Sequence, residues 1–151
     1  NDEANPPLAL AKHLKETLSG EVGTVFVWFD DFEMGRNEEM AEMFPELKDF
    51  FDSINAKTVD LMKVFKDGLY IDPDFQGSSS IKKVLPVLCP DLKYDDLGIS
   101  EGLTASISWY RAVKWTLTDA ERETIFQDLL EYCELDTKAM VEIYRVLAAL
   151  S

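Results

Sequence analysis

Apolar residues recur every three or four positions along most of this 151-residue chain, which is the spacing of one face of an α-helix. The longest such series runs over residues 47–65 and stops at Asp67-Gly68, a typical helix end. Another begins at Pro6 and repeats leucine every four residues before Gly20. The spacing therefore predicts an all-α fold of six to eight helices.

Residues 21–32 are ambiguous between strand and helix. Positions 24–29 have the β-branched and aromatic composition of a strand, but polar and apolar residues do not alternate there. On a helical wheel the apolar side chains of the segment share one face: Val22, Val25, Phe26, Phe29 and Phe32. We therefore expect a helix over this segment.

Three cap-type residues divide the last third of the chain into equal segments. Ser100, Thr118 and Asp136 are 18 residues apart, and Thr118 forms a capping box with Glu121. An isoleucine follows each cap by seven residues: Ile107, Ile125 and Ile143. Short links between helices of about 15 residues make neighbours antiparallel. The pattern predicts antiparallel helical hairpins, either in a short array or as part of a compact bundle.

Length and composition fit one globular domain. The chain is 46% hydrophobic and 11% aromatic, so we expect a single helical domain over residues 6–151, preceded by a disordered segment or linker over 1–5. No apolar run reaches the roughly 18–20 residues that span a bilayer, and we expect no membrane insertion by this segment. Because the chain begins with Asn1 rather than Met, a targeting segment or membrane anchor could precede it.

Acidic charge is concentrated in one segment. The net charge of −14 argues against nucleic acid and anionic lipid surfaces as partners. Residues 30–52 hold nine acidic and two basic residues, a net charge of −7 that is half of the total. This segment is either a solvated helix face beside a core stripe, or an acidic rim around apolar anchors that binds a basic amphipathic helix. The second alternative gives these candidate partner-binding residues: Asp30, Asp31, Glu38, Glu39, Met40, Glu42 and Met43.

Trp109 and Trp115 form a second candidate contact site. They are six residues apart and so lie on different faces of a helix. Trp combines a large apolar area with a polar group, and is enriched in protein interfaces. Packing of both side chains in the core remains the alternative.

Signals of catalysis and of cofactor binding are weak. His13 stands without ligands at metal spacing, and Cys89 and Cys133 allow one disulfide or two structural thiols. Residues 72–83 superficially follow a calcium loop, but Lys83 occupies the position of the bidentate glutamate. We expect instead a turn followed by a helix that Ser80 caps. Since phosphate-binding loops and nucleophile motifs are also missing, we expect no enzyme activity, cofactor or metal.

The whole profile resembles the kinetoplastid mitochondrial membrane-anchored MIX proteins. The resemblance covers residues 6–150 and rests on paired Phe-rich helices, on tryptophans and on helix caps: Trp28, Trp109, Trp115, Ser100, Thr118 and Asp136. It implies a seven-helix domain with the layout of tetratricopeptide, HEAT and 14-3-3 proteins. It also implies an anchor to the inner mitochondrial membrane and association with cytochrome c oxidase subunits. It carries over no functional residues.

These observations predict a non-catalytic helical scaffold or adaptor that holds protein partners. The first alternative is a small-ligand-binding domain or enzyme with buried carboxylates, which requires an enclosed cavity. The second is an acidic mimic of nucleic acid that binds a basic protein. Uneven charge weakens the second alternative, because residues 1–75 carry a net charge of −10 and residues 76–151 only −4.

Overall fold

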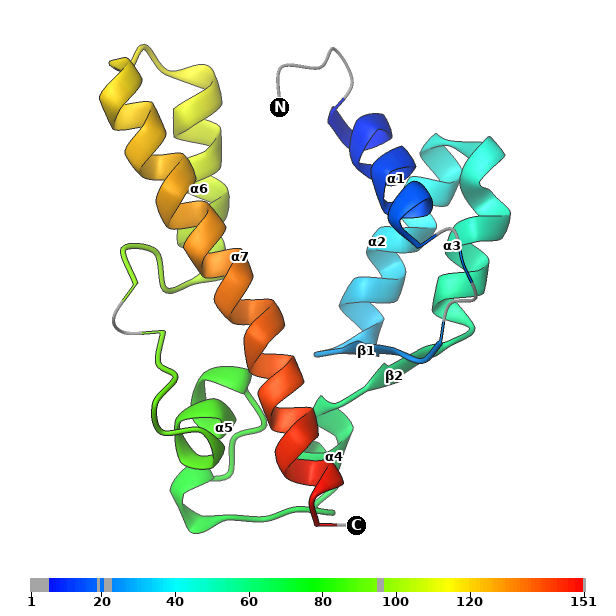
Figure 1. Ribbon diagram of the computed structural model, residues 1–151, viewed down its shortest axis with the longest axis vertical. Helices are drawn as coiled ribbons and strands as arrows, with labels where there is room; N and C mark the ends of the chain where they lie inside the picture. Colours follow the sequence, from blue (N-terminus) through cyan, green and yellow to red (C-terminus); the bar gives the residue numbers. More distant parts are fainter. Residues whose placement is uncertain (1–5, 19, 21–22, 95–96, 151) are drawn as a thin grey trace. The chain divides into compact units, whose positions relative to one another are not determined.

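The computed structural model describes residues 6–18, 20, 23–94 and 97–150. Seven α-helices dominate this part of the chain, which confirms the all-α prediction (Figure 1). The chain divides into two compact units, Asn1–Tyr70 and Ile71–Ser151, and each is described by itself. The extent of the expected single domain stays a prediction, and residues 1–5 lie outside the described part.

The first unit contains four of the helices and a small parallel sheet. Strand β1 pairs with β2 in parallel, with Val25 opposite Thr58 and Val27 opposite Asp60. The connection between the two strands runs through α2 and α3, which pack against each other. In chain order the elements are α1 (Pro6–Thr17), β1 (Val25–Val27), α2 (Asp30–Met43), the 3-10 turn η1 (Pro45–Leu47), α3 (Lys48–Asn55), β2 (Thr58–Asp60) and α4 (Met62–Lys66).

The core of this unit lies where α1, α2 and α3 meet. Its fully covered members are Ala11, Ala41, Leu47 and Phe51, and Met40 packs against them from the edge. Ala11 of α1, Ala41 of α2 and Phe51 of α3 belong to the same cluster, so all three helices contribute to this core.

Two segments of this unit that were predicted as helix contain the strands instead. Residues 25–27 are β1, and the helix begins only at Asp30; residues 21–22 lie outside the described part. The long series over 47–65 is broken by β2 between α3 and α4. A short strand that is covered on both faces need not alternate polar and apolar residues, so a helical wheel accommodates it equally well.

Asp60 ties the ends of the two strands together. Only 6% of its surface is exposed, and its Oδ1 accepts hydrogen bonds from the backbone N–H of Phe29 at 3.0 Å and of Met62 at 2.8 Å. Phe29 has φ 78°, in the left-handed region that costs a non-glycine residue about 1–3 kcal/mol. The Asp60 carboxylate therefore holds a strained turn at the start of α2.

The second unit is built around one long helix. Helix α7 (Asp119–Ala148) packs against α6 (Gly102–Lys114) and α5 (Ile81–Leu88), and η2 (Pro73–Phe75) packs against α5. Figure 1 shows α6 running antiparallel to the first half of α7. The capping box at Thr118 is present, with the Thr118 hydroxyl and the Glu121 side chain both bonded across the first turn.

The predicted hairpin at Asp136 is wrong. Asp136 lies inside the continuous 30-residue helix α7, where its carboxylate accepts a hydrogen bond from the Tyr94 hydroxyl instead of capping a new helix. The three isoleucines also differ, since Ile143 is fully buried while Ile107 is 60% exposed. The 72–83 segment does form a turn followed by α5, although the Ser80 side chain makes no capping bond.

Tyr94 and Tyr132 lie together against Asp136. The Tyr94 hydroxyl is 2.5 Å from Asp136 Oδ1, and the two tyrosine ring centroids are 6.1 Å apart. Burial, followed by the hydrogen bond to Asp136, raises the pKa of Tyr94 well above its usual value. Burial and the same carboxylate raise the pKa of Tyr132 to about 12. Both phenols are therefore held neutral in the folded chain.

We expect Asp60→Ala to lower the free energy of unfolding by about 2–4 kcal/mol, because two partly buried backbone N–H groups lose their acceptor at about 1–2 kcal/mol each. Urea denaturation followed by circular dichroism measures the change. The control is Asp67→Ala at an exposed position, expected to stay within about 0.5 kcal/mol of the wild type. An Asp60→Ala chain as stable as the wild type would contradict the role of this carboxylate.

A second expectation concerns alkaline pH. Tyrosines in the unfolded chain ionise near pH 10, while Tyr132 in the folded chain keeps its proton to about pH 12. Ionisation therefore stabilises the unfolded chain first, so the free energy of unfolding is unaffected below pH 10 and declines above it. Urea unfolding at a series of pH values from 8 to 11 tests this decline. Replacing both Tyr94 and Tyr132 by Phe should flatten it, and Tyr110→Phe at an exposed site should not. Equal slopes in all three chains would refute the assignment.

Candidate functional site

An apolar groove of about 250 Å³ lies between α1 and α2 in the first unit. We call it the α1–α2 groove: Leu10 and Leu14 of α1 face Met40 and Met43 of α2, the buried Ala11 and Phe51 lie beneath them, and Arg36, Asn37 and Glu39 complete the lining. Leu10 is 63% exposed and Met43 is 55% exposed. Large apolar side chains that stay exposed beside a hollow mark a surface suited to binding another apolar group.

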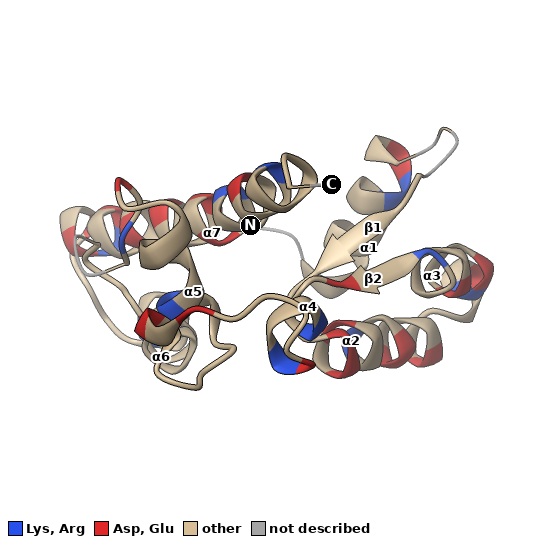
Figure 2. Cartoon of the chain, turned by 90° about the horizontal axis from the view of Figure 1, so that it is seen from below, with Lys and Arg blue, Asp and Glu red and all other residues tan. Residues whose placement is uncertain are grey.

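The predicted acidic residues are distributed around α2 rather than gathered at the groove. Figure 2 shows acidic residues recurring along this helix. Glu39 lies at the groove, where its carboxylate pairs with the Arg36 guanidinium at 2.5 Å. Glu38 and Glu42 are exposed two residues before and after Met40, about 200° around the helix axis from the groove. Of the predicted residues, the groove therefore brings together Glu39, Met40 and Met43.

Asp30 is engaged elsewhere, at the start of α2. Its Oδ2 pairs with Lys63 Nζ at 2.5 Å, and its Oδ1 accepts a hydrogen bond from the Asp31 backbone N–H. The hydrogen bond to Lys63 lowers the pKa of Asp30, and the same contact raises the pKa of Lys63. Asp31 is exposed. The structure does not bring this pair of aspartates into the α1–α2 groove.

Trp109 and Trp115 belong to an exposed apolar surface in the second unit. Their side chains are 48% and 59% exposed, so neither is packed in the core. The exposed apolar residues of α6, together with Trp115 directly after the helix, are here named the α6 aromatic face: Leu103, Ile107, Trp109, Tyr110, Val113 and Trp115. The Arg111 guanidinium lies 5.7 Å from the centroid of a Trp115 ring. Because Ala112 is fully buried, α6 contacts its neighbour through small residues and leaves its bulky ones outside.

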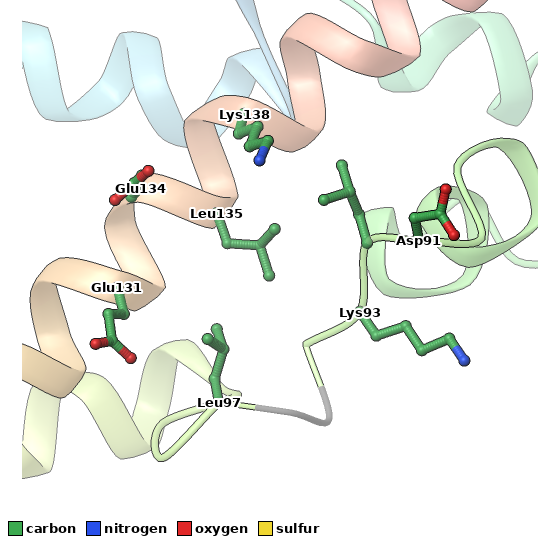
Figure 3. Close-up of a pocket in the computed structure, with 8 residues that line it drawn as sticks. Asp91, Lys93, Leu97, Glu131, Glu134, Leu135 and Lys138 are labelled. Atoms are coloured by element: carbon green, nitrogen blue, oxygen red, sulfur yellow. The ribbon is translucent and has the colours of Figure 1, made fainter.

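A second hollow of about 250 Å³ lies between α7 and the 91–97 segment of the same unit. Figure 3 shows Leu135 and Lys138 projecting from α7 toward the segment that carries Asp91, Lys93 and Leu97. Asp91, Glu131 and Glu134, the three carboxylates of its lining, are exposed. A binding site or active site with buried carboxylates, the alternative raised by the sequence, gains no support from this hollow.

The remaining chemical candidates are dispersed. Cys89 and Cys133 are free thiols, and burial raises the pKa of each, which keeps both protonated at neutral pH. Cys133 is exposed on α7, and Leu130, about one turn before it, is 66% exposed. His13 is exposed on α1. Among the described residues, no three His, Cys, Asp or Glu side chains are grouped as metal ligands.

Sequence reasoning missed half of the groove. The leucines of α1 were visible as a helix face, but their spacing could not show that Leu10 and Leu14 stay exposed beside α2. It also missed Asp60, because a helical interpretation of the 47–65 series places this residue on the polar side, about 100° from Leu61. The burial of Asp60 depends on strand β2, which that interpretation did not include.

Comparison with known proteins identifies one relative and one family. The chain is similar to uncharacterized protein UU173 of Ureaplasma parvum, with 29% identity over 137 residues that cover 78% of this chain. It spans only 19% of the length of that relative. No solved structure gave a significant match.

These findings leave the resemblance to MIX proteins, with its mitochondrial and cytochrome c oxidase expectations, as a prediction. No helix in the described part of the chain combines the length and apolarity needed to cross a bilayer.

The sequence profile described as "Domain of unknown function (DUF2779)" matches residues 1–80, which include the whole α1–α2 groove. Because that match covers more than half of its residues, the chain belongs to the DUF2779 family.

Proposed function

We propose that this chain is a non-catalytic helical interaction module that binds a basic amphipathic helix of a partner protein in the α1–α2 groove. The observation that carries the proposal is the groove itself, where exposed Leu10 and Met43 flank a hollow above the buried core. Helices bind such grooves by inserting apolar residues from one face. Methionine suits this role because its flexible side chain adapts to different shapes.

Charge on α2 favours a basic partner. The helix carries six acidic residues and Arg36 as its single basic one. A basic helix would be attracted toward α2 over several ångströms, with an association rate that falls as salt screens the charges. Glu39, at the groove itself, is placed to contact a lysine or arginine beside the apolar anchors.

The α6 aromatic face supports the scaffold part of the proposal, because it offers a second exposed apolar surface in the other unit. A chain with two such surfaces can hold two partners or two segments of one partner. Cytochrome c oxidase subunits at the mitochondrial inner membrane are the candidates that the MIX resemblance suggests. Since the chain spans 19% of its relative, the proposal concerns this segment and not a whole polypeptide.

The test uses a fluorescent amphipathic helical peptide of leucine and lysine, with a leucine–glutamate peptide as its charge-reversed control. We expect the basic peptide to bind and the acidic one not to. Replacing both Leu10 and Met43 by Asp should weaken binding at least about tenfold, equivalent to about 1.4 kcal/mol. Fluorescence anisotropy gives the affinity, and circular dichroism shows that helical content is retained.

Matched charge variants separate the groove from the rest of α2. Glu39→Lys should weaken binding by changing the groove itself, at little cost in stability because its ion pair with Arg36 is exposed. The double variant Glu38→Lys with Glu42→Lys changes charge on the opposite side, and should reduce mainly the association rate. Equal affinity in wild type and in the Leu10/Met43 variant would reject the groove. The same variants can then be compared in affinity purification from the native cell.

A further inference from the structure

The parallel sheet of the first unit is much smaller than parallel sheets usually are. In the part of the chain that the structure describes, it has two parallel strands of three residues each. Parallel sheets occur almost entirely within larger α/β arrangements whose faces are covered by helices. Two-stranded sheets are marginal by themselves, and three or more strands are normally needed. A two-stranded parallel sheet therefore indicates that further strands complete it.

The two strands differ in the position that they suit. Strand β1 is apolar throughout, continues into Trp28 and Phe29, and is partly buried at each of its three positions. Such continuous apolar runs are typical of inner parallel strands. Strand β2 instead combines a buried Asp60 with Val59, which is 45% exposed. Composition thus marks β1 as an inner strand and β2 as an edge strand.

The hydrogen bonds show which edge of β1 faces outward. The Val25 N–H donates to the Lys57 carbonyl at 2.9 Å, and the Val27 carbonyl accepts from the Leu61 N–H at 3.0 Å. Alternate residues of a strand direct their backbone groups to opposite edges. The backbone register therefore directs the backbone groups of Thr24, Phe26 and Trp28 to the edge away from β2. Among the described residues, the sheet has no third strand at this edge.

A buried polar atom next to β1 supports incompleteness. Trp28 Nε1, just after β1, is buried without a hydrogen-bond partner among the described residues. Buried polar atoms in folded proteins are nearly always paired, so this atom requires an explanation. An additional strand beside β1 would bring backbone acceptors into this region.

We propose that β1 is an inner strand, and that a further strand of the same polypeptide, lying outside residues 1–151, pairs in parallel with its outer edge. The same polypeptide is favoured over a separate partner, because parallel neighbours are normally joined by crossover connections within one domain. Length leaves room for such a strand, since this chain spans 19% of its relative. The inference goes beyond the proposed function and does not depend on the α1–α2 groove.

Hydrogen exchange tests the pairing directly. The native polypeptide that contains these residues is compared with the 151-residue chain, and exchange of the amides between Thr24 and Trp28 is followed by mass spectrometry or NMR. We expect the amides at the outer edge to exchange about 100-fold more slowly in the native polypeptide. The Val59 amide, inside β2, serves as the reference for the existing pair. Equal exchange at the outer edge in both forms, or a native polypeptide with no further residues, would overturn the proposal.

Proline variants in the native polypeptide provide a second measurement. Thr24→Pro removes an N–H group directed to the outer edge, and should lower the melting temperature of the native polypeptide but not that of the 151-residue chain. Thr24→Ala controls for the side chain, and Val59→Pro should destabilise both forms. Equal effects of Thr24→Pro in the two forms would overturn the proposal. So would outer-edge protection in the 151-residue chain that rises with concentration, because a second copy would then be the partner.

Discussion

The buried carboxylate of Asp60 is the contact on which the first unit depends. It accepts hydrogen bonds from the backbone on both sides of the strand pair, at Phe29 and at Met62. The chain leaves β1 through the left-handed Phe29 and enters α2 at once, so this contact sets where α2 begins. Because Met40 and Met43 are carried by α2, the geometry of the α1–α2 groove is determined partly at the far end of that helix.

Local signals predicted the helices better than their connections. The α1 leucines, the Thr118 capping box and the turn before α5 are encoded within a few residues, and all three could be read from the sequence. The strands could not, because three covered residues leave no alternation to detect. The prediction of a helix start at Asp136 failed because this residue lies inside α7 and accepts a hydrogen bond from Tyr94, which is distant in the sequence.

The candidate site was predicted by chemical type more than by position. Methionines and acidic residues on one helix suggested an apolar groove with an acidic rim. A groove lies around Met40 and Met43, but Glu39 alone among the predicted acidic residues lines it. Its second wall comes from α1, more than 20 residues away in the sequence. Which carboxylate faces the groove depends on the rotation of α2 about its axis, which is fixed by packing of Ala41 and Phe51 in the core. The number of charges along the sequence does not reveal that rotation.

The uninterrupted α7 gives the second unit a mechanical property. Thirty helical residues form a stiff rod of about 45 Å, and the Tyr94 hydroxyl is bonded to it at Asp136, near its midpoint. Figure 1 shows α6 beside the first half of this rod and α5 beside the second. Because the helix is unbroken between these contacts, its two halves cannot bend independently without loss of backbone hydrogen bonds. A displacement of α7 at its contact with α6 would therefore be transmitted along the helix to its contact with α5.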